Sequence, residues 1–180
     1  LWEGGWPHRI DPETLATIDR YDYGGVLRNR FSWLDERIAP EMSFSAHPKI
    51  HPTTGVLHNF GTVPGLKQRL VLYEVSPDGK AQITKVIKMD EMTFAHESGH
   101  QIFFLTPVAF DMSRALTGLT SPAASIRVNR SLPTQVLVVD PAGTVRRLTT
   151  DFCFIFHFVN GYQHEDGTLV LDGLRLTDYP

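Results

Sequence analysis

Short runs of apolar and β-branched residues recur along the chain, separated by residues that favour turns. Four of these turns lie at positions 51–55, 76–79, 140–143 and 164–167, and each ends in glycine. Two such runs joined by a polar turn are typical of a β-hairpin. The pattern therefore predicts four hairpins, with FSAHPKI and VLHNFGT, LVLYEV and AQITKVI, QVLVVD and TVRRLTT, and FCFIFHFV and TLVLDGLRL as the paired strands.

Helical signals are weak by comparison. The segment DPETLATI (11–18) has a capping residue followed by proline, but it is short and fits a turn equally well. Another strand is expected in HQIFFLTPVAF (100–110), before a loop rich in Ser, Thr, Gly and Pro. Successive hairpins with little helix indicate an all-β meander, arranged as a sandwich, a barrel or propeller blades.

Composition and charge narrow the class of protein. With 180 residues, 42% of them hydrophobic and 21% charged, the chain is expected to form a single domain over residues 1–180 with a real core. A net charge of -3 without any Lys/Arg-rich block argues against a nucleic-acid partner. The only cysteine is Cys153, which excludes an internal disulfide and favours a cytoplasmic location. No apolar run is long enough for a membrane-spanning helix.

A histidine interrupts the most apolar run of the chain, FCFIFHFV (152–159). Because strand side chains alternate, the phenylalanines would lie on one face, and Cys153, Ile155, His157 and Val159 on the other. Both faces are apolar, so we expect an interior strand and a buried His157. A buried imidazole needs a hydrogen-bond partner or a metal ion. A hydrogen-bonded core histidine is the simpler of these two alternatives.

The first predicted hairpin contains three more histidines. His47 directly precedes Pro48, and a proline suits a strand edge or a bend, where His47 could turn toward a channel or an axis. His51 begins the turn and His58 lies in the returning strand. We expect His51 and His58 to be exposed or to cap the turn.

Another cluster lies in MTFAHESGHQIFF (92–104), where His96 and His100 are four residues apart. The adjacent Glu97 invites comparison with the HExxH zinc helix of metalloproteases. Gly99 weakens a helix, however, and the following QIFF is typical of a strand. A zinc hydrolase using His96 and Glu97 is therefore disfavoured, while one metal ligand from this cluster remains plausible.

Taken together and in order, these segments resemble the carotenoid cleavage oxygenase family, which includes apocarotenoid and lignostilbene dioxygenases and the retinoid isomerase of the eye. The resemblance rests on WEGGWPHRIDPETLATI, FSAHPKIHPTTGVLHNFG, LVLYEVSPDGK and FHFVNGYQHEDGTLVLD, and it runs over nearly all 180 residues. It implies a seven-bladed β-propeller. At roughly 40 to 45 residues per blade, this chain would hold about four blades. We therefore expect a fragment that lacks N-terminal and C-terminal parts of the propeller.

The resemblance also implies ferrous iron on the propeller axis, held by four histidines. His47 matches the first ligand and His157 the third. His96 is favoured for the second, although an alignment without a gap places Met92 or Thr93 there instead. The fourth ligand has no counterpart in the chain.

Glu3 matches a family glutamate that hydrogen-bonds a ligating histidine, which fixes the orientation of the imidazole ring. Without the resemblance, Glu3 would be read as an exposed terminal residue.

The activity that the resemblance implies is oxygen-dependent cleavage of a conjugated carbon-carbon double bond, which gives two carbonyl products. The substrate would be a carotenoid, an apocarotenoid or a stilbene. Such substrates reside in membranes, so peripheral membrane contact is expected by analogy. The alternative is a catalytically inactive, propeller-like binding module with an incomplete metal site.

Overall fold

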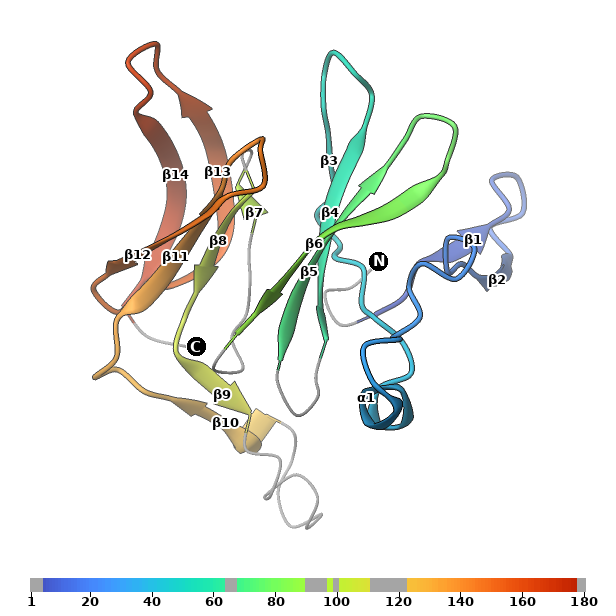
Figure 1. Cartoon of the computed structure of the whole chain (residues 1–180), viewed down its shortest axis with the longest axis horizontal. Helices are drawn as coiled ribbons and strands as arrows, with labels where there is room; N and C mark the ends of the chain where they lie inside the picture. Colours follow the sequence, from blue (N-terminus) through green and yellow to red (C-terminus); the bar gives the residue numbers. More distant parts are fainter. Residues whose placement is uncertain (1–4, 64–67, 90–96, 99–100, 111–122, 178–180) are drawn as a thin grey trace. The chain divides into compact units, whose positions relative to one another are not determined.

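The computed structural model describes residues 5–63, 68–89, 97–98, 101–110 and 123–177, and most of them lie in antiparallel strands (Figure 1). The chain divides into two compact units, Leu1–Asp90 and Glu91–Pro180. Each unit contains one four-stranded sheet and at least one two-stranded ribbon. The all-β class expected from the hairpin pattern is confirmed.

The first unit consists of a ribbon, a helix and a four-stranded sheet. Its elements are β1 (His8–Ile10), β2 (Thr17–Arg20), α1 (Trp33–Ile38), β3 (Lys49–Ile50), β4 (Leu57–Val63), β5 (Arg69–Val75) and β6 (Ala81–Lys88). β1 pairs with β2, and the sheet follows the order β3-β4-β5-β6, so that each strand pairs with the next along the chain. A four-stranded antiparallel meander of this kind is typical of a propeller blade.

The second unit has a less regular order. Its elements are β7 (Glu97–Ser98), β8 (Ile102–Leu105), β9 (Val108–Phe110), η1 (Ala123–Ser125), β10 (Ile126–Val128), β11 (Thr134–Val139), β12 (Val145–Thr150), β13 (Phe154–Gln163) and β14 (Leu169–Leu176). The sheet has the order β12-β11-β8-β7, while β9 with β10 and β13 with β14 form separate ribbons. The predicted strand at 100–110 is therefore divided between a sheet strand and a ribbon strand.

All four predicted hairpins are present, as β3–β4, β5–β6, β11–β12 and β13–β14. Their turns share a glycine with a positive φ of 69° to 87°, a conformation that glycine adopts without steric cost. These glycines are Gly55, Gly79, Gly143 and Gly167. The turn residues that marked the hairpins in the sequence are thus the residues that the backbone geometry requires.

The segment 11–18 forms a turn and the start of β2, not a helix. Its Asp11 carboxylate accepts hydrogen bonds from the backbone N–H groups of Glu13 and Thr14, at 2.9 and 2.8 Å. The helix α1, which begins after Ser32, was not predicted from the sequence. The Ser32 hydroxyl accepts the N–H of Asp35 at 3.0 Å and donates to its carboxylate at 2.8 Å. This arrangement resembles a capping box, so the Ser-x-x-Asp spacing was the sequence signal from which the start of α1 could have been predicted.

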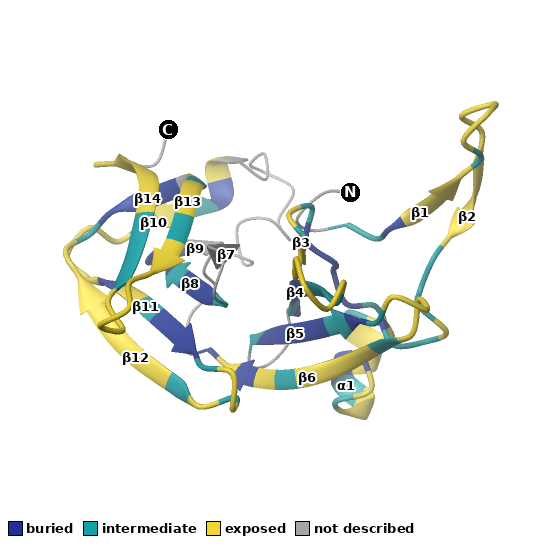
Figure 2. Ribbon diagram, turned by 90° about the horizontal axis from the view of Figure 1, so that it is seen from above, coloured by how far each residue is buried: buried dark blue, intermediate teal, exposed yellow. Residues whose placement is uncertain are grey.

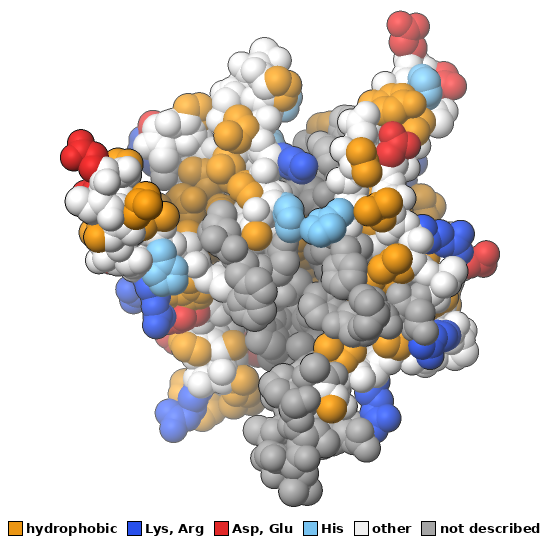
Figure 3. All heavy atoms as spheres, turned by 180° about the vertical axis from the view of Figure 1, so that it is seen from behind, with side chains coloured by type: hydrophobic (Ala, Val, Ile, Leu, Met, Phe, Trp, Pro, Cys, Tyr) orange, Lys and Arg blue, Asp and Glu red, His pale blue; other side chains and the backbone are white. Residues whose placement is uncertain are grey.

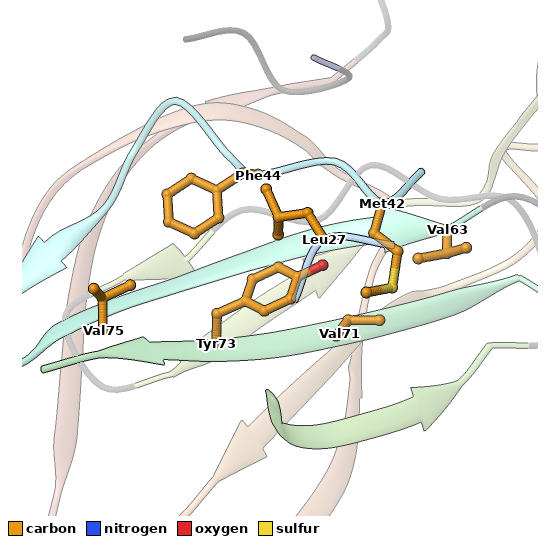
Figure 4. Close-up of a cluster of buried hydrophobic side chains, with 7 residues drawn as sticks. All are labelled: Leu27, Met42, Phe44, Val63, Val71, Tyr73 and Val75. Atoms are coloured by element: carbon orange, nitrogen blue, oxygen red, sulfur yellow. The ribbon is translucent and has the colours of Figure 1, made fainter. Parts of the chain in front are cut away.

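The core of the first unit lies between the β-sheet and two segments that precede it (Figure 4). Its buried members are Leu27, Met42, Phe44, Val63, Val71, Tyr73 and Val75. The rings of Phe44 and Tyr73 pack with centroids 5.6 Å apart. Figure 2 shows that β5 is mostly buried while much of β6 is exposed.

A buried ion pair links α1 to β5. The Arg69 Nη2 atom lies 3.0 Å from the Asp35 Oδ2 atom, and the two side chains are only 14% and 3% exposed. The Arg69 guanidinium also lies over the ring of Phe31, 4.7 Å from its centroid. Removing either charge would leave the other buried without compensation, so the pair fixes where α1 packs.

Residues 43–45 continue the edge of the sheet beyond the end of β3. The Ser43 hydroxyl donates to the carbonyl oxygen of Thr62 at 3.0 Å and accepts its N–H at 2.9 Å. The N–H of Ser45 donates to the carbonyl oxygen of Phe60 at 2.8 Å. Gly61 makes this approach possible, because a Cβ there would overlap the Ser43 carbonyl oxygen and lie 2.8 Å from its carbon.

We expect Gly61→Ala to destabilise the chain by about 3 kcal/mol, because the new methyl group must push residue 43 away from β4. Urea denaturation followed by circular dichroism measures the loss. Gly79→Ala is the matched control, because its φ of +84° adds strain while nothing lies within 4 Å of the new Cβ. Equal losses in the two variants would contradict the close-approach argument.

Stability should also fall in acid through the turn carboxylates. The N–H groups of Thr144 and Thr168 donate to Asp140 and Asp166, and these hydrogen bonds hold the pKa of both carboxyls below the usual Asp value. The unfolded chain therefore binds these protons first. The contribution is fully present above a pH of about 3.9 and is lost as the pH falls through the lowered pKa values.

The urea midpoint measured from pH 7 down to pH 2.5 tests this expectation. The double variant Asp140→Asn, Asp166→Asn should show a weaker decline than the unmodified chain. Identical declines would show that the turn carboxylates do not contribute.

Candidate metal centre

His47 lies where the chain leaves the core of the first unit. Ser45 is fully buried, whereas the imidazole of His47 is exposed. The N–H of His47 donates to the Ser45 hydroxyl at 3.1 Å, and the Asn59 side-chain amide donates to the Ser45 carbonyl oxygen at 2.9 Å. The backbone that carries His47 is therefore fixed from the buried side, while its side chain is exposed.

His157 lies on β13, but it is exposed, so the prediction of a buried imidazole is wrong. The covered part of the run ends early: Cys153, Phe154 and Ile155 are buried, whereas Val159 is 75% exposed. In the described part of the chain β13 pairs as a ladder only with β14, so it belongs to a two-stranded ribbon and is not an interior strand of a sheet. Apolar residues on both faces therefore indicate burial only for the first residues of this run.

Two register shifts break the alternation on which that prediction depended. Between Ile155 and Phe158, β13 advances by three residues while β14 advances by two, from Arg175 to Gly173. A second shift follows between Phe158 and Asn160. His157 therefore lies in a bulged stretch, and bulges redirect side chains and are frequent beside active sites.

The start of β13 is anchored by a buried threonine. The Thr134 hydroxyl donates to the Cys153 carbonyl oxygen at 2.9 Å and accepts the Cys153 N–H at 3.1 Å. The Thr106 hydroxyl donates to the same carbonyl oxygen at 3.1 Å. These bonds tie the residue before β13 to β11 and to the link between β8 and β9, four residues before His157.

The other two histidines of the first hairpin have local roles. The Nδ1 atom of the exposed His51 accepts the N–H groups of Thr53 and Thr54 at 3.3 and 3.2 Å, so the expected capping role is confirmed. His58 is half-buried on β4, and its Nδ1 atom lies 3.5 Å from a Glu74 carboxylate oxygen. His58 is thus neither fully exposed nor a turn cap.

The remaining candidates lie outside the described residues. They are Glu3, Met92, Thr93, His96 and His100. The choice of His96, Met92 or Thr93 for the second ligand therefore stays a prediction. Glu97 and Ser98 form β7, which argues against a helical zinc motif at this position.

Among the described residues, His47 and His157 could each donate one nitrogen to a metal ion, but they do not form a cluster. Among the residues that the structure describes, no three His, Cys, Asp or Glu side chains come together around a point. His47 belongs to the first unit and His157 to the second. Each presents an exposed imidazole on an anchored backbone, and neutral imidazole is a suitable ligand for iron, copper, nickel and zinc.

A cavity of about 390 Å³ in the first unit includes neither His47 nor His157 in its lining. It is lined by Gly24, Gly25, Val26, Arg28, Arg30, Phe31, Met42 and Ile83. Two guanidinium groups are unsuited to a purely apolar substrate, so this cavity is not assigned to one.

The comparison with known families decides the identity of the fold. All of residues 1–180 match the family described as retinal pigment epithelial membrane protein (RPE65). The chain belongs to the carotenoid cleavage oxygenase family. Membership confirms the resemblance that the four sequence segments indicated.

This chain has curated relatives in bacteria, fungi and humans. It is 29% identical to apocarotenoid-15,15'-oxygenase of Synechocystis, over 100% of this chain and 36% of the relative. It is 27% identical to resveratrol cleavage oxygenase 1 of Aspergillus fumigatus and to isoeugenol monooxygenase of Pseudomonas putida, over 96% and 94% of this chain. The chain spans 33% and 34% of those two proteins, and thus about a third of the length of these relatives.

Solved structures give the same assignment. The cobalt-substituted apocarotenoid oxygenase of Synechocystis matches all of this chain with a TM-score of 0.83 and 30% identity, and 37% of that protein is covered. The expectation of a partial propeller segment is therefore confirmed.

The residues that anchor the two histidines were not predicted from the sequence. They are Ser45, Asn59 and Thr134. A signal was present for the first: Ser43 and Ser45 alternate with Met42 and Phe44 just before His47. Hydroxyl groups within a buried segment need hydrogen-bond partners, so they indicate close contact with another strand.

We expect Thr134→Val to destabilise the chain by about 3 kcal/mol, because it keeps the shape but leaves the buried N–H and C=O of Cys153 without the Thr134 hydroxyl. Thr134→Ser, which keeps the hydroxyl, is the matched control and should cost about 1 kcal/mol. Urea denaturation compares the two. A serine variant that is as unstable as the valine variant would show that packing of the methyl group matters more.

Proposed function

We propose that the protein is a non-haem Fe(II) oxygenase that cleaves a conjugated carbon-carbon double bond with O2 and releases carbonyl products. Its proposed substrate is a carotenoid, an apocarotenoid or a stilbene. The observation that carries this proposal is the family match over the whole chain. The named relatives support it, because they include an apocarotenoid oxygenase, a resveratrol cleavage oxygenase and a human β,β-carotene 15,15'-dioxygenase.

The proposed metal ligands are His47, His96 and His157. Exposed imidazoles on anchored backbones support the first and the third, and the cobalt-substituted relative supports a metal centre in the family. Ferrous iron with open coordination positions supplies the dioxygen chemistry that organic side chains lack. Each ligating ring must be neutral, with one nitrogen directed at the metal and the other protonated.

Glu3 is proposed to accept a hydrogen bond from the protonated nitrogen of a ligating histidine. A carboxylate in that position fixes the tautomer and the ring orientation, and it makes the other nitrogen a better donor to a metal.

The proposed partners are the apolar substrate and O2, without nucleic acid. On the face that Figure 3 shows, Lys and Arg side chains lie singly or in small groups among apolar and neutral ones, which does not favour a polyanion. We also propose a cytoplasmic location with peripheral membrane contact. The described part contains no helix that could cross a bilayer, while Ile10, Leu15 and Ile18 are exposed on the β1–β2 hairpin.

We expect His157→Ala to reduce cleavage at least 100-fold and to lower the bound iron, while the β-sheet circular dichroism is retained because the side chain is exposed. Purified protein supplied with Fe(II) is assayed with resveratrol and with an apocarotenoid, and its iron is quantified. His164→Ala, an exposed histidine in the turn of the same hairpin, is the matched control.

Unchanged cleavage in the His157→Ala variant would remove His157 from the metal centre. An unmodified protein that binds no iron and cleaves neither substrate would instead favour the binding module without an active metal site.

A further inference from the structure

Ser45 makes three hydrogen bonds that converge on the backbone before His47. Its N–H donates to the carbonyl oxygen of Phe60 at 2.8 Å, and its carbonyl oxygen accepts the Asn59 side-chain amide at 2.9 Å. Its hydroxyl accepts the N–H of His47 at 3.1 Å. The first two bonds hold Ser45 against β4, and the third holds the His47 backbone against Ser45.

Asn59 is itself held in place. It is 3% exposed, and its side-chain oxygen accepts the N–H of Phe60 at 2.9 Å while its amide nitrogen donates to Ser45. Both ends of the amide are thus engaged within the buried sheet. A side chain fixed at both ends has little rotational freedom, so Ser45 is held by a rigid partner.

The backbone of His47 is restricted from both directions. On its N-terminal side, the Ser45 hydroxyl holds its N–H in a local side-chain to backbone turn. On its C-terminal side, the ring of Pro48 disfavours the helical conformation of the preceding residue. With both backbone torsions limited, the direction of the Cα–Cβ bond is set before any ligand binds.

We propose that Ser45 is a positioning residue that directs the His47 imidazole toward the metal; this inference rests on the proposed role of His47 as a ligand. Ser45 does not itself touch the metal. It acts by holding the His47 backbone, which lowers the conformational freedom that metal binding would otherwise have to remove.

Ser43 provides a matched control. It is also a buried serine of the same segment, with two side-chain hydrogen bonds to β4, but both of these end on Thr62. Ser43→Ala should therefore reduce stability without loosening His47, whereas Ser45→Ala should loosen His47 directly.

Two measurements test the proposal. In the metal-free protein, amide hydrogen exchange at His47 should become faster in Ser45→Ala and change much less in Ser43→Ala. In a cobalt(II) titration, Ser45→Ala should weaken the affinity about 10-fold, because altering an outer partner of a ligand typically costs 10- to 100-fold. Ser45→Thr keeps the hydroxyl and should restore the affinity even if its extra methyl group lowers stability.

The outcomes separate this inference from the proposed function. If His47→Ala leaves cobalt binding unchanged, His47 is not a ligand. The proposed ligand role of His47 and the positioning role of Ser45 are then both overturned. If His47→Ala weakens binding but Ser45→Ala and Ser43→Ala have equal effects on exchange and affinity, only the positioning role is overturned. If His47→Ala weakens cobalt binding, and faster exchange and lower affinity are specific to Ser45→Ala, both the ligand role of His47 and the positioning role of Ser45 are supported.

Discussion

The close approach of residues 43–45 to β4 is the constraint on which the first unit depends. Without a side chain at Gly61, the segment reaches the free edge of β4 and satisfies its backbone groups where β3 has ended. The same approach brings Phe44 against Tyr73 in the core. One backbone contact thus closes the sheet edge, completes the apolar core and sets the point at which the chain emerges at His47.

Much of the fold could be predicted from the sequence because its signals are local. A glycine with positive φ and a flanking polar residue define each hairpin turn within four or five residues, so all four hairpins were found. The exposure of His157 could not be found in that way. It depends on bulges in β13, which arise from pairing with β14, and on which part of the strand other elements cover. The helix α1 was missed although its Ser32 cap was readable.

In the candidate site, too, some features have a local signal in the sequence and others depend on the folded structure. His47 and His157 were identified through the family resemblance, because both lie in short motifs that are typical of the family. The side chains that hold them were not identified, because the anchoring depends on residues 14 and 19 positions apart. Asn59 donates to Ser45 and Thr134 donates to Cys153, through bonds that only the folded sheet brings together. Anchoring residues of this kind carry no motif of their own, and their sequence signal is a polar residue in an apolar segment.

The paired bulges of β13 allow the length of this strand to change without a change in the pairing on either side. Each bulge adds one residue relative to β14, so side-chain facing is inverted after the first and restored after the second. A one-residue deletion between Ile155 and Asn160 would remove one bulge, and residues 160–163 would keep their β14 partners and therefore the faces on which they lie. A change of one or two residues beside His157 can therefore be absorbed within the bulged stretch, where it redirects the imidazole and leaves both ends of the hairpin in place.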